Sequence, residues 1–162
     1  MKQYKWIIIL VNLLILLVSF NNSVFKKETL LSDGDLILLE LAPVDPRSLM
    51  QGDYMELRYA ISTGIETDSI SKRGFCVVKL IADNIAKKVR IQENRTPLKK
   101  GEYLIEYTIK DWRNLSIGTE SFFFQEGKSE RYEAAKYGGI KVDNQGNSLL
   151  IGLYDEALKE IK

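Results

Sequence analysis

The chain has 162 residues, of which 23 are lysine or arginine and 22 are aspartate or glutamate, so its net charge is close to zero. It contains no histidine, which excludes Ser-His and Cys-His catalysis, histidine general bases and the usual zinc and iron sites. Its single cysteine, Cys76, cannot form an intrachain disulfide, and the apolar run around it favours a buried core residue over a reactive thiol.

The first predicted element is an apolar segment over residues 4–25, with no charged side chain between Lys5 and Lys26. About 20 residues are needed to cross the hydrocarbon core of a bilayer. A cleaved signal peptide and a buried core helix are the competing interpretations, but the region after the apolar run contains no alanine, which is atypical of a cleavage site. We therefore expect an uncleaved anchor over residues 1–27, which contacts the lipid bilayer through residues 4–25, and a separate domain over residues 28–162.

The distribution of charge bears on the choice of partner and on the side of the membrane. Residues 1–27 hold four lysines and no acid, which leaves 19 basic against 22 acidic side chains in residues 28–162. A mildly acidic domain has no electrostatic reason to bind nucleic acid, so we expect no nucleic-acid partner. The basic residues on the two sides of the apolar segment are nearly balanced. Because a first apolar segment behind a very short basic N-terminus usually translocates the rest of the chain, we expect a single-pass membrane protein with its C-terminal domain outside the cytoplasm.

Short runs typical of β-strands, separated by turn signals, occupy the chain from residue 33 onward. In "DYMELRYAI" (53–61) the residues alternate, and Met55, Leu57, Tyr59 and Ile61 are predicted to form the core face. "EYLIEYTIKDW" (102–112) alternates in the same way. Hairpins are predicted around residues 83–84 and 144–146.

One helix is predicted within this β series, in "GKSERYEAAKYGG" (127–139), with Ser129 as its N-cap and Gly138 and Gly139 closing its C-terminus. The expected fold class is α+β. It has about seven or eight mainly antiparallel strands, in a sandwich or small curved barrel with one helix, plus an N-terminal transmembrane helix.

The most distinctive motif is "GDYMELRY" (52–59). Gly52 and Asp53 are typical of a turn that closes the preceding connection. Tyr54 begins the polar face of the strand, where a large aromatic side chain is unexpected. Either the connection over residues 43–51 folds over Tyr54 and binds its hydroxyl, or the side chain is exposed for a partner or a small ligand.

This stretch resembles the GDYXXLXY family of bacterial membrane-anchored proteins. "PVDPRSLMQGDY", "ESFFFQEGK" and "AKYGGIKVDNQGNSLLIGL" are similar to further family segments, so the resemblance extends from Pro43 to Leu153. It implies a protein of unknown function that is often encoded beside a multi-spanning membrane protein, and it supplies no catalytic residues. The motif positions, with a structural or a binding role, are Gly52, Asp53, Tyr54, Leu57, Tyr59, Glu126, Gly127 and Lys128.

Two functions remain as hypotheses. The favoured one is a non-enzymatic, membrane-anchored protein whose extracytoplasmic β-domain binds a membrane-protein partner, with no cofactor and no metal. The alternative is a small-molecule binder or histidine-independent hydrolase that uses Asp53, Tyr54 and Glu126 around one pocket. "DNQGN" (143–147) resembles the start of a calcium loop but lacks the downstream glutamate, so we expect a hairpin turn there.

Overall fold

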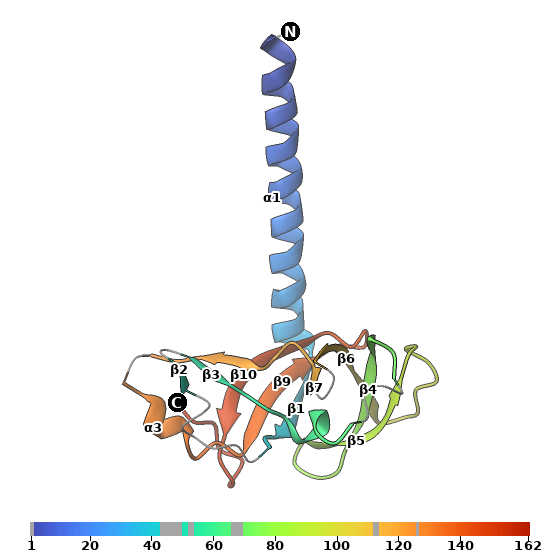
Figure 1. The fold of residues 1–162 in the computed structure, drawn as a ribbon, viewed down its shortest axis with the longest axis vertical. Coiled ribbons are helices and arrows are strands. Elements are labelled where there is room, and N and C mark those ends of the chain that lie inside the picture. Colours follow the sequence, from blue (N-terminus) through green and yellow to red (C-terminus); the bar gives the residue numbers. More distant parts are fainter. Residues whose placement is uncertain (1, 43–49, 52–53, 66–69, 112–113, 126) are drawn as a thin grey trace.

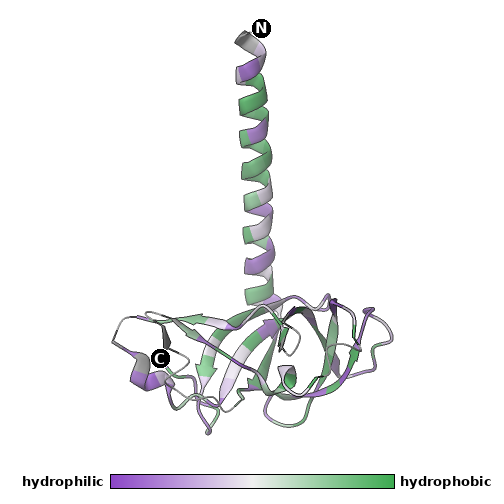
Figure 2. Ribbon diagram, viewed as in Figure 1, coloured by the Kyte–Doolittle hydropathy of each residue, from purple (hydrophilic) through white to green (hydrophobic). Residues whose placement is uncertain are grey.

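The protein consists of one long helix and one β-domain (Figure 1). The computed structural model describes residues 2–42, 50–51, 54–65, 70–111, 114–125 and 127–162. Helix α1 (Lys2–Asp33) projects from the domain as a single rod, and Figure 2 shows its outer part as mostly hydrophobic. By length and composition the helix could cross a membrane, although a signal sequence near an N-terminus would have the same properties.

The foot of α1 is fixed to the domain by packing and hydrogen bonds. Leu30, in the last turns of the helix, is only 7% exposed. The N–H of Gly34 donates to the carbonyl of Leu30 at 3.0 Å, and Nζ of Lys141 donates to the carbonyl of Gly34 at 2.7 Å. A Cβ at Gly34 would collide with the carbonyl oxygen of Leu30, so the close turn from helix to strand requires glycine at this position. These contacts set the direction of α1 relative to the domain.

The domain is built on a seven-stranded sheet that curls into a half-barrel. Its strand order is β10-β9-β1-β5-β4-β6-β7, in which β1 and β5 are parallel and all other neighbours are antiparallel. The strands are β1 (Asp35–Glu40), β4 (Arg73–Leu80), β5 (Ile85–Gln92), β6 (Glu102–Asp111), β7 (Asn114–Ser116), β9 (Tyr137–Val142) and β10 (Ser148–Tyr154). The hairpins that the sequence predicts around residues 83–84 and 144–146 are confirmed as the connections β4–β5 and β9–β10.

Three short strands form a second, smaller sheet in the order β2-β3-β8. They are β2 (Met50–Gln51), β3 (Tyr54–Glu56) and β8 (Ser121–Phe123), and two short helical turns accompany them, η1 (Ala60–Ser62) and α3 (Ser129–Tyr132). The expected fold class, mainly antiparallel β with an N-terminal apolar helix, is therefore confirmed.

One hydrophobic core joins the large sheet to the segment that continues from β3 into η1. The predicted core face of Met55, Leu57, Tyr59 and Ile61 is confirmed, because all four side chains are buried in this core. Their partners from the large sheet and its connections are Ile37, Leu39, Cys76, Val78, Ala86, Ile105, Tyr107, Leu115, Ile117, Ile140, Val142 and Leu153. Burial of apolar surface on this scale is the main stabilising contribution to such a domain.

Two predictions about local structure are wrong. The predicted helix over residues 127–139 is reduced to the single turn α3, whose N-cap is Lys128 and not Ser129. Gly138 and Gly139 lie inside strand β9, where each is paired with both β1 and β10. The predicted strand over residues 53–61 is also shorter, since β3 ends at Glu56 and the chain then turns into η1.

Candidate functional site

Tyr59, the last residue of the motif, lies at the centre of the core. Its side chain has no exposed surface. The hydroxyl donates a hydrogen bond to the carbonyl of Thr119 at 2.7 Å and accepts one from Oγ1 of Thr119 at 3.2 Å. Burial raises the pKa of the Tyr59 phenol far above its ordinary value, so the hydroxyl stays protonated. A neutral, buried tyrosine whose hydroxyl both donates and accepts a hydrogen bond acts here as a structural link.

Gly138 of β9 provides the space for the Tyr59 ring. A Cβ at this position would lie 2.8 Å from Cε1 and 3.1 Å from the hydroxyl oxygen of Tyr59. Such distances are shorter than non-bonded carbon contacts allow, so only glycine lets the ring pack on the strand. Three segments that are far apart in the sequence therefore meet at Tyr59: the segment of Tyr59 itself, the one that contains Thr119, and the one that contains Gly138.

Leu57 and Glu120 connect the motif to the β7–β8 turn. The N–H of Leu57 donates to the carbonyl of Glu120 at 2.6 Å. The Glu120 carboxylate accepts hydrogen bonds from the N–H of Ile117 at 2.5 Å and from Oγ of Ser116 at 2.9 Å. Glu120 thus closes its own turn with its side chain, and Leu57 is held in place from the core side and from the backbone.

The remaining motif positions are only partly described. Gly52, Asp53 and Glu126 lie outside the described residues, so the predicted pocket of Asp53, Tyr54 and Glu126 stays a prediction. The backbone of Tyr54 belongs to β3 and pairs with Phe123 of β8, but its side chain is outside the described part of the structure.

The "EGK" segment leads into helix α3. Gly127 adopts a left-handed backbone with φ of 79°, and Lys128 occupies the N-cap position of α3 without a capping hydrogen bond from its side chain. Beside this turn, the rings of Phe122, Phe124 and Tyr132 pack together, with centroid separations of 5.0 to 6.5 Å. Gly127 and Lys128 are therefore placed by the structure at a turn that holds an aromatic cluster.

A small polar pocket of about 170 Å³ lies beside Leu57 and Tyr59. Oγ of Ser62, which lines it, is buried and has no hydrogen-bond partner among the described residues. Each water molecule occupies about 30 Å³ in the liquid, so the pocket has room for a few waters that would satisfy this hydroxyl. The other lining residues are Glu56, Arg58, Thr63, Lys110, Leu115, Ser116 and Glu120.

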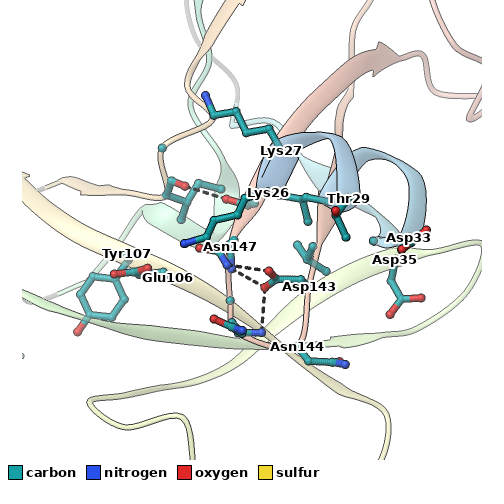
Figure 3. A pocket seen from close by; sticks show the side chains of 18 of the residues that line it. Lys26, Lys27, Thr29, Asp33, Asp35, Glu106, Tyr107, Asp143, Asn144 and Asn147 are labelled. Carbon is teal, nitrogen blue, oxygen red and sulfur yellow. Dashed lines mark hydrogen bonds between the residues drawn. The ribbon is translucent and has the colours of Figure 1, made fainter. Parts of the chain in front are cut away.

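A larger groove of about 850 Å³ lies at the foot of α1 (Figure 3). One wall is formed by the end of the helix, from Ser23 to Asp33, and the other by parts of β6, the β7–β8 turn and the β9–β10 turn. Ligand pockets in proteins have volumes of about 300–1,000 Å³, so the groove is large enough for a peptide segment or a small molecule. Sequence reasoning missed this groove, because its walls come from four segments that no sequence pattern connects.

Charged side chains of both signs line the groove. Lys26 extends to the side where Glu106 and Asn147 lie, whereas Lys27 points away from the β9–β10 turn (Figure 3). Neither lysine is in an ion pair with a described residue. Asp143 is occupied within its own turn, since its carboxylate accepts hydrogen bonds from the N–H groups of Gln145 and Asn147 at 2.8 and 2.9 Å. The expected hairpin turn at residues 143–147 is thereby confirmed.

The match to a family model covers residues 16–153, from the middle of α1 to β10. The chain belongs to the GDYXXLXY protein family. No curated protein and no solved structure matches the chain. The family has no assigned function, and its members carry an N-terminal apolar helix.

The structure gives a physical reason for the second half of the GDYXXLXY motif. Leu57 and Tyr59 hold the small sheet against the large one through Glu120, Thr119 and Gly138. In the part of the chain that the structure describes, no group of three acidic or cysteine side chains is placed to hold a metal ion. Of the two pockets described above, the groove at the foot of α1 is the larger.

Proposed function

We propose that this GDYXXLXY protein is a single-pass membrane protein whose β-domain stands outside the cytoplasm and binds another membrane protein. The observation that carries the proposal is the position of the 850 Å³ groove, at the point where the apolar helix meets the domain.

The length of the apolar segment supports the anchor. Residues 4–25 in a helix with a rise of 1.5 Å per residue extend over about 33 Å, which matches a hydrocarbon core of about 30 Å. Lys26 and Lys27 follow directly, at the level where lysine side chains reach the headgroup region. The large hydrophobic side chains from Ile7 to Leu17 are all exposed in the isolated chain, and a bilayer would cover them.

The fixed foot of the helix supports a role at the membrane surface. Because the contacts of Leu30 and Gly34 hold α1 to the domain, an anchored α1 would keep the groove close to the membrane surface. An occupant must therefore be available at the membrane surface, which favours the extramembrane segment of another membrane protein over a freely diffusing ligand. Lys26 and Glu106, which form no ion pair with a described residue, provide charges of both signs for such a segment.

Intact mass and extraction test the anchor. The full-length protein should stay in membranes after alkaline carbonate extraction, with the mass of the uncleaved chain, 18.6 kDa. Release into the soluble fraction with a mass reduced by about one N-terminal helix would identify a signal peptide and would overturn the anchor.

Thiol labelling tests the side of the membrane. Cys76 is buried, so an Ile81→Cys variant adds one exposed thiol on the domain. A membrane-impermeant maleimide should label this variant in intact cells as strongly as in lysed cells. Labelling that requires lysis would place the domain in the cytoplasm.

Co-purification tests the partner. After mild crosslinking and gentle solubilisation, a tagged full-length chain should recover one membrane protein in reproducible proportion. Glu106→Lys, inside the groove, should lower this recovery, whereas Glu130→Lys, on exposed α3 outside it, should not. Recovery of the chain alone, or equal recovery by both variants, would contradict a partner that binds in the groove.

A further inference from the structure

The polar residues inside the apolar part of α1 share one face of the helix. Asn12 and Ser19 are the polar positions between Lys5 and Phe20, and they are seven residues apart. Residues at alternating spacings of four and three lie along one side of an α-helix. The Asn12 face is defined here by Asn12, Leu16, Ser19, Ser23, Lys26 and Leu30.

Asn12 lies deep in the segment that would cross the hydrocarbon core. It is eight residues from Tyr4 and thirteen from Phe25, or about 12 and 20 Å along the helix axis. Its Nδ2 donates a hydrogen bond to the carbonyl of Ile8 at 3.0 Å, one turn earlier. Its side-chain carbonyl and second N–H have no partner among the described residues, and the side chain is exposed.

A half-satisfied amide in hydrocarbon is unfavourable, and polar side chains in transmembrane helices accordingly face other helices or water-filled cavities. Interhelical hydrogen bonds of Asn and close approach at Ser are the usual ways in which such faces associate. The polar side chains of Asn12 and Ser19 therefore favour the packing of a second helix against this face.

The Asn12 face runs directly into the groove. Ser23, Lys26 and Leu30 belong to this face and also line the groove at its helix wall. A helix that packs beside Asn12 and Ser19 would leave the membrane above the groove, and the segment after that helix would meet the turn at residues 143–147. The intramembrane face and the groove thus form one continuous surface.

Two features disfavour a second copy of this chain as the occupant. A symmetric parallel pair places each residue of the interface against its own copy, so Lys26 would face Lys26 close to the membrane surface. Leu30 is on the same face and is buried against the domain, so each domain lies on the side of its helix that would face the other copy. In a symmetric pair the two domains would therefore compete for the same space. A helix of a different protein, continued by a short segment, meets neither obstacle.

We propose that the Asn12 face of α1 packs against a transmembrane helix of a different membrane protein, whose adjoining extramembrane segment enters the groove at the foot of α1. This rests on the membrane-anchored, partner-binding function proposed above and specifies the contact. The partner helix carries a polar side chain at the depth of Asn12 and an acidic group near Lys26.

Site-specific photo-crosslinking of the full-length chain in native membranes tests this contact. A benzophenone amino acid replaces Leu16 on the Asn12 face or Leu14 on the opposite face, and a third probe replaces Gln145 in the groove. The Leu16 probe should give an adduct that mass spectrometry assigns to a transmembrane segment of another protein. The Leu14 probe should not give this adduct.

Asn12→Leu and Asn21→Leu form a matched pair of variants. Nδ2 of Asn21 also donates to the carbonyl four residues earlier, Leu17, at 2.9 Å, but Asn21 lies on the opposite side of the helix from Asn12. Because one interhelical hydrogen bond is lost, Asn12→Leu should lower the Leu16 adduct about 3- to 10-fold. Asn21→Leu should leave its yield unchanged.

Other outcomes overturn the inference in distinguishable ways. An adduct that contains two copies of this chain would show that the face is homotypic. Equal adducts from Leu16 and Leu14, or no effect of Asn12→Leu, would show that the face is not selective. A Gln145 adduct to a membrane protein without any Leu16 adduct would overturn the helix contact and leave the proposed function intact. If neither the Leu16 probe nor the Gln145 probe gives an adduct and the chain purifies alone, both the helix contact and the proposed partner-binding function are contradicted.

Discussion

The ring of Tyr59 lies directly on the backbone of Gly138, so that a Cβ at residue 138 would be only 2.8 Å from Cε1 of the ring. This contact joins the end of the GDYXXLXY motif to the beginning of strand β9, where Gly138 lies 79 residues later in the chain. The packing of Tyr59 on Gly138 explains which residue types are required at positions 59 and 138. Residue 138 must lack a side chain, and residue 59 must supply a flat ring with a hydroxyl that reaches Thr119.

Gly138→Ala should destabilise the domain. The added methyl group can be accommodated only if the buried ring of Tyr59 or strand β9, which is paired on both sides, shifts, and overpacking of this kind costs about 1–3 kcal/mol. Chemical denaturation of the purified protein measures the change. Lys136→Ala, at an exposed position just before the same strand, should be close to neutral. Equal stability of the two variants would contradict the close packing of Tyr59 on Gly138.

Tyr59→Phe should also destabilise the domain while keeping its shape. The substitution removes the hydroxyl and leaves the carbonyl and Oγ1 of Thr119 without their partner in a buried site, which costs about 1–3 kcal/mol. Tyr103→Phe is the matched control, since no described residue hydrogen-bonds to the Tyr103 hydroxyl. Thermal unfolding followed by circular dichroism should show a lower Tm for Tyr59→Phe alone.

The ion pair of Arg90 and Glu102 should make stability depend on pH in acid. Two hydrogen bonds of 2.8 Å from Arg90, together with one from the N–H of Lys99, lower the pKa of Glu102 to about 2. In the folded state the carboxylate therefore stays charged at pH values where the unfolded chain would bind a proton. Its stabilising contribution is fully present above the ordinary pKa of about 4.5 and is lost as the pH falls from there towards 2.

Unfolding midpoints measured between pH 6 and pH 2 check this dependence. Glu102→Gln should reduce the loss of stability in this range, because residue 102 then no longer titrates. The control is Glu106→Gln. Glu106 lies on the same strand and forms no ion pair with a described residue. A Glu102→Gln protein with the same acid profile as the wild type would show that the pair does not contribute.

Cys76 should be unreactive in the folded protein. Its side chain has no exposed surface, and burial raises the pKa of the thiol to about 11, with a smaller opposing effect of Lys88. Little thiolate is therefore present at pH 8. Alkylation by iodoacetamide, monitored by mass spectrometry, should be slow in buffer and fast in denaturant. The Ile81→Cys variant provides an exposed thiol for comparison, and rapid native modification of Cys76 would contradict its burial.

The sequence predicted the elements whose signals are local. The apolar helix, the long alternating strand β6, the two hairpin turns and the core face from Met55 to Ile61 all follow from the spacing of apolar residues and from turn chemistry. The family resemblance on three motifs was likewise confirmed over most of the chain.

Features that depend on distant contacts were not predicted. Gly138 and Gly139 follow a segment with good helix formers, so helix capping was the natural local interpretation. They lie in a strand because the rings of Tyr59 and Tyr154 pack on them and β9 is paired on both sides. The groove at the foot of α1 could not be predicted for the same reason, since its walls are separated by many residues in the chain.

The position of β1 in the sheet has a consequence for biosynthesis. This strand directly follows α1, yet its hydrogen-bonded neighbours are β5 and β9, which end 52 and 102 residues later. A nascent chain therefore presents β1, already next to its apolar helix, with at least one open edge until β9 has been made. Truncation before Tyr137 would leave β1 without its β9 neighbour, and an unpaired strand edge of this kind is prone to aggregation.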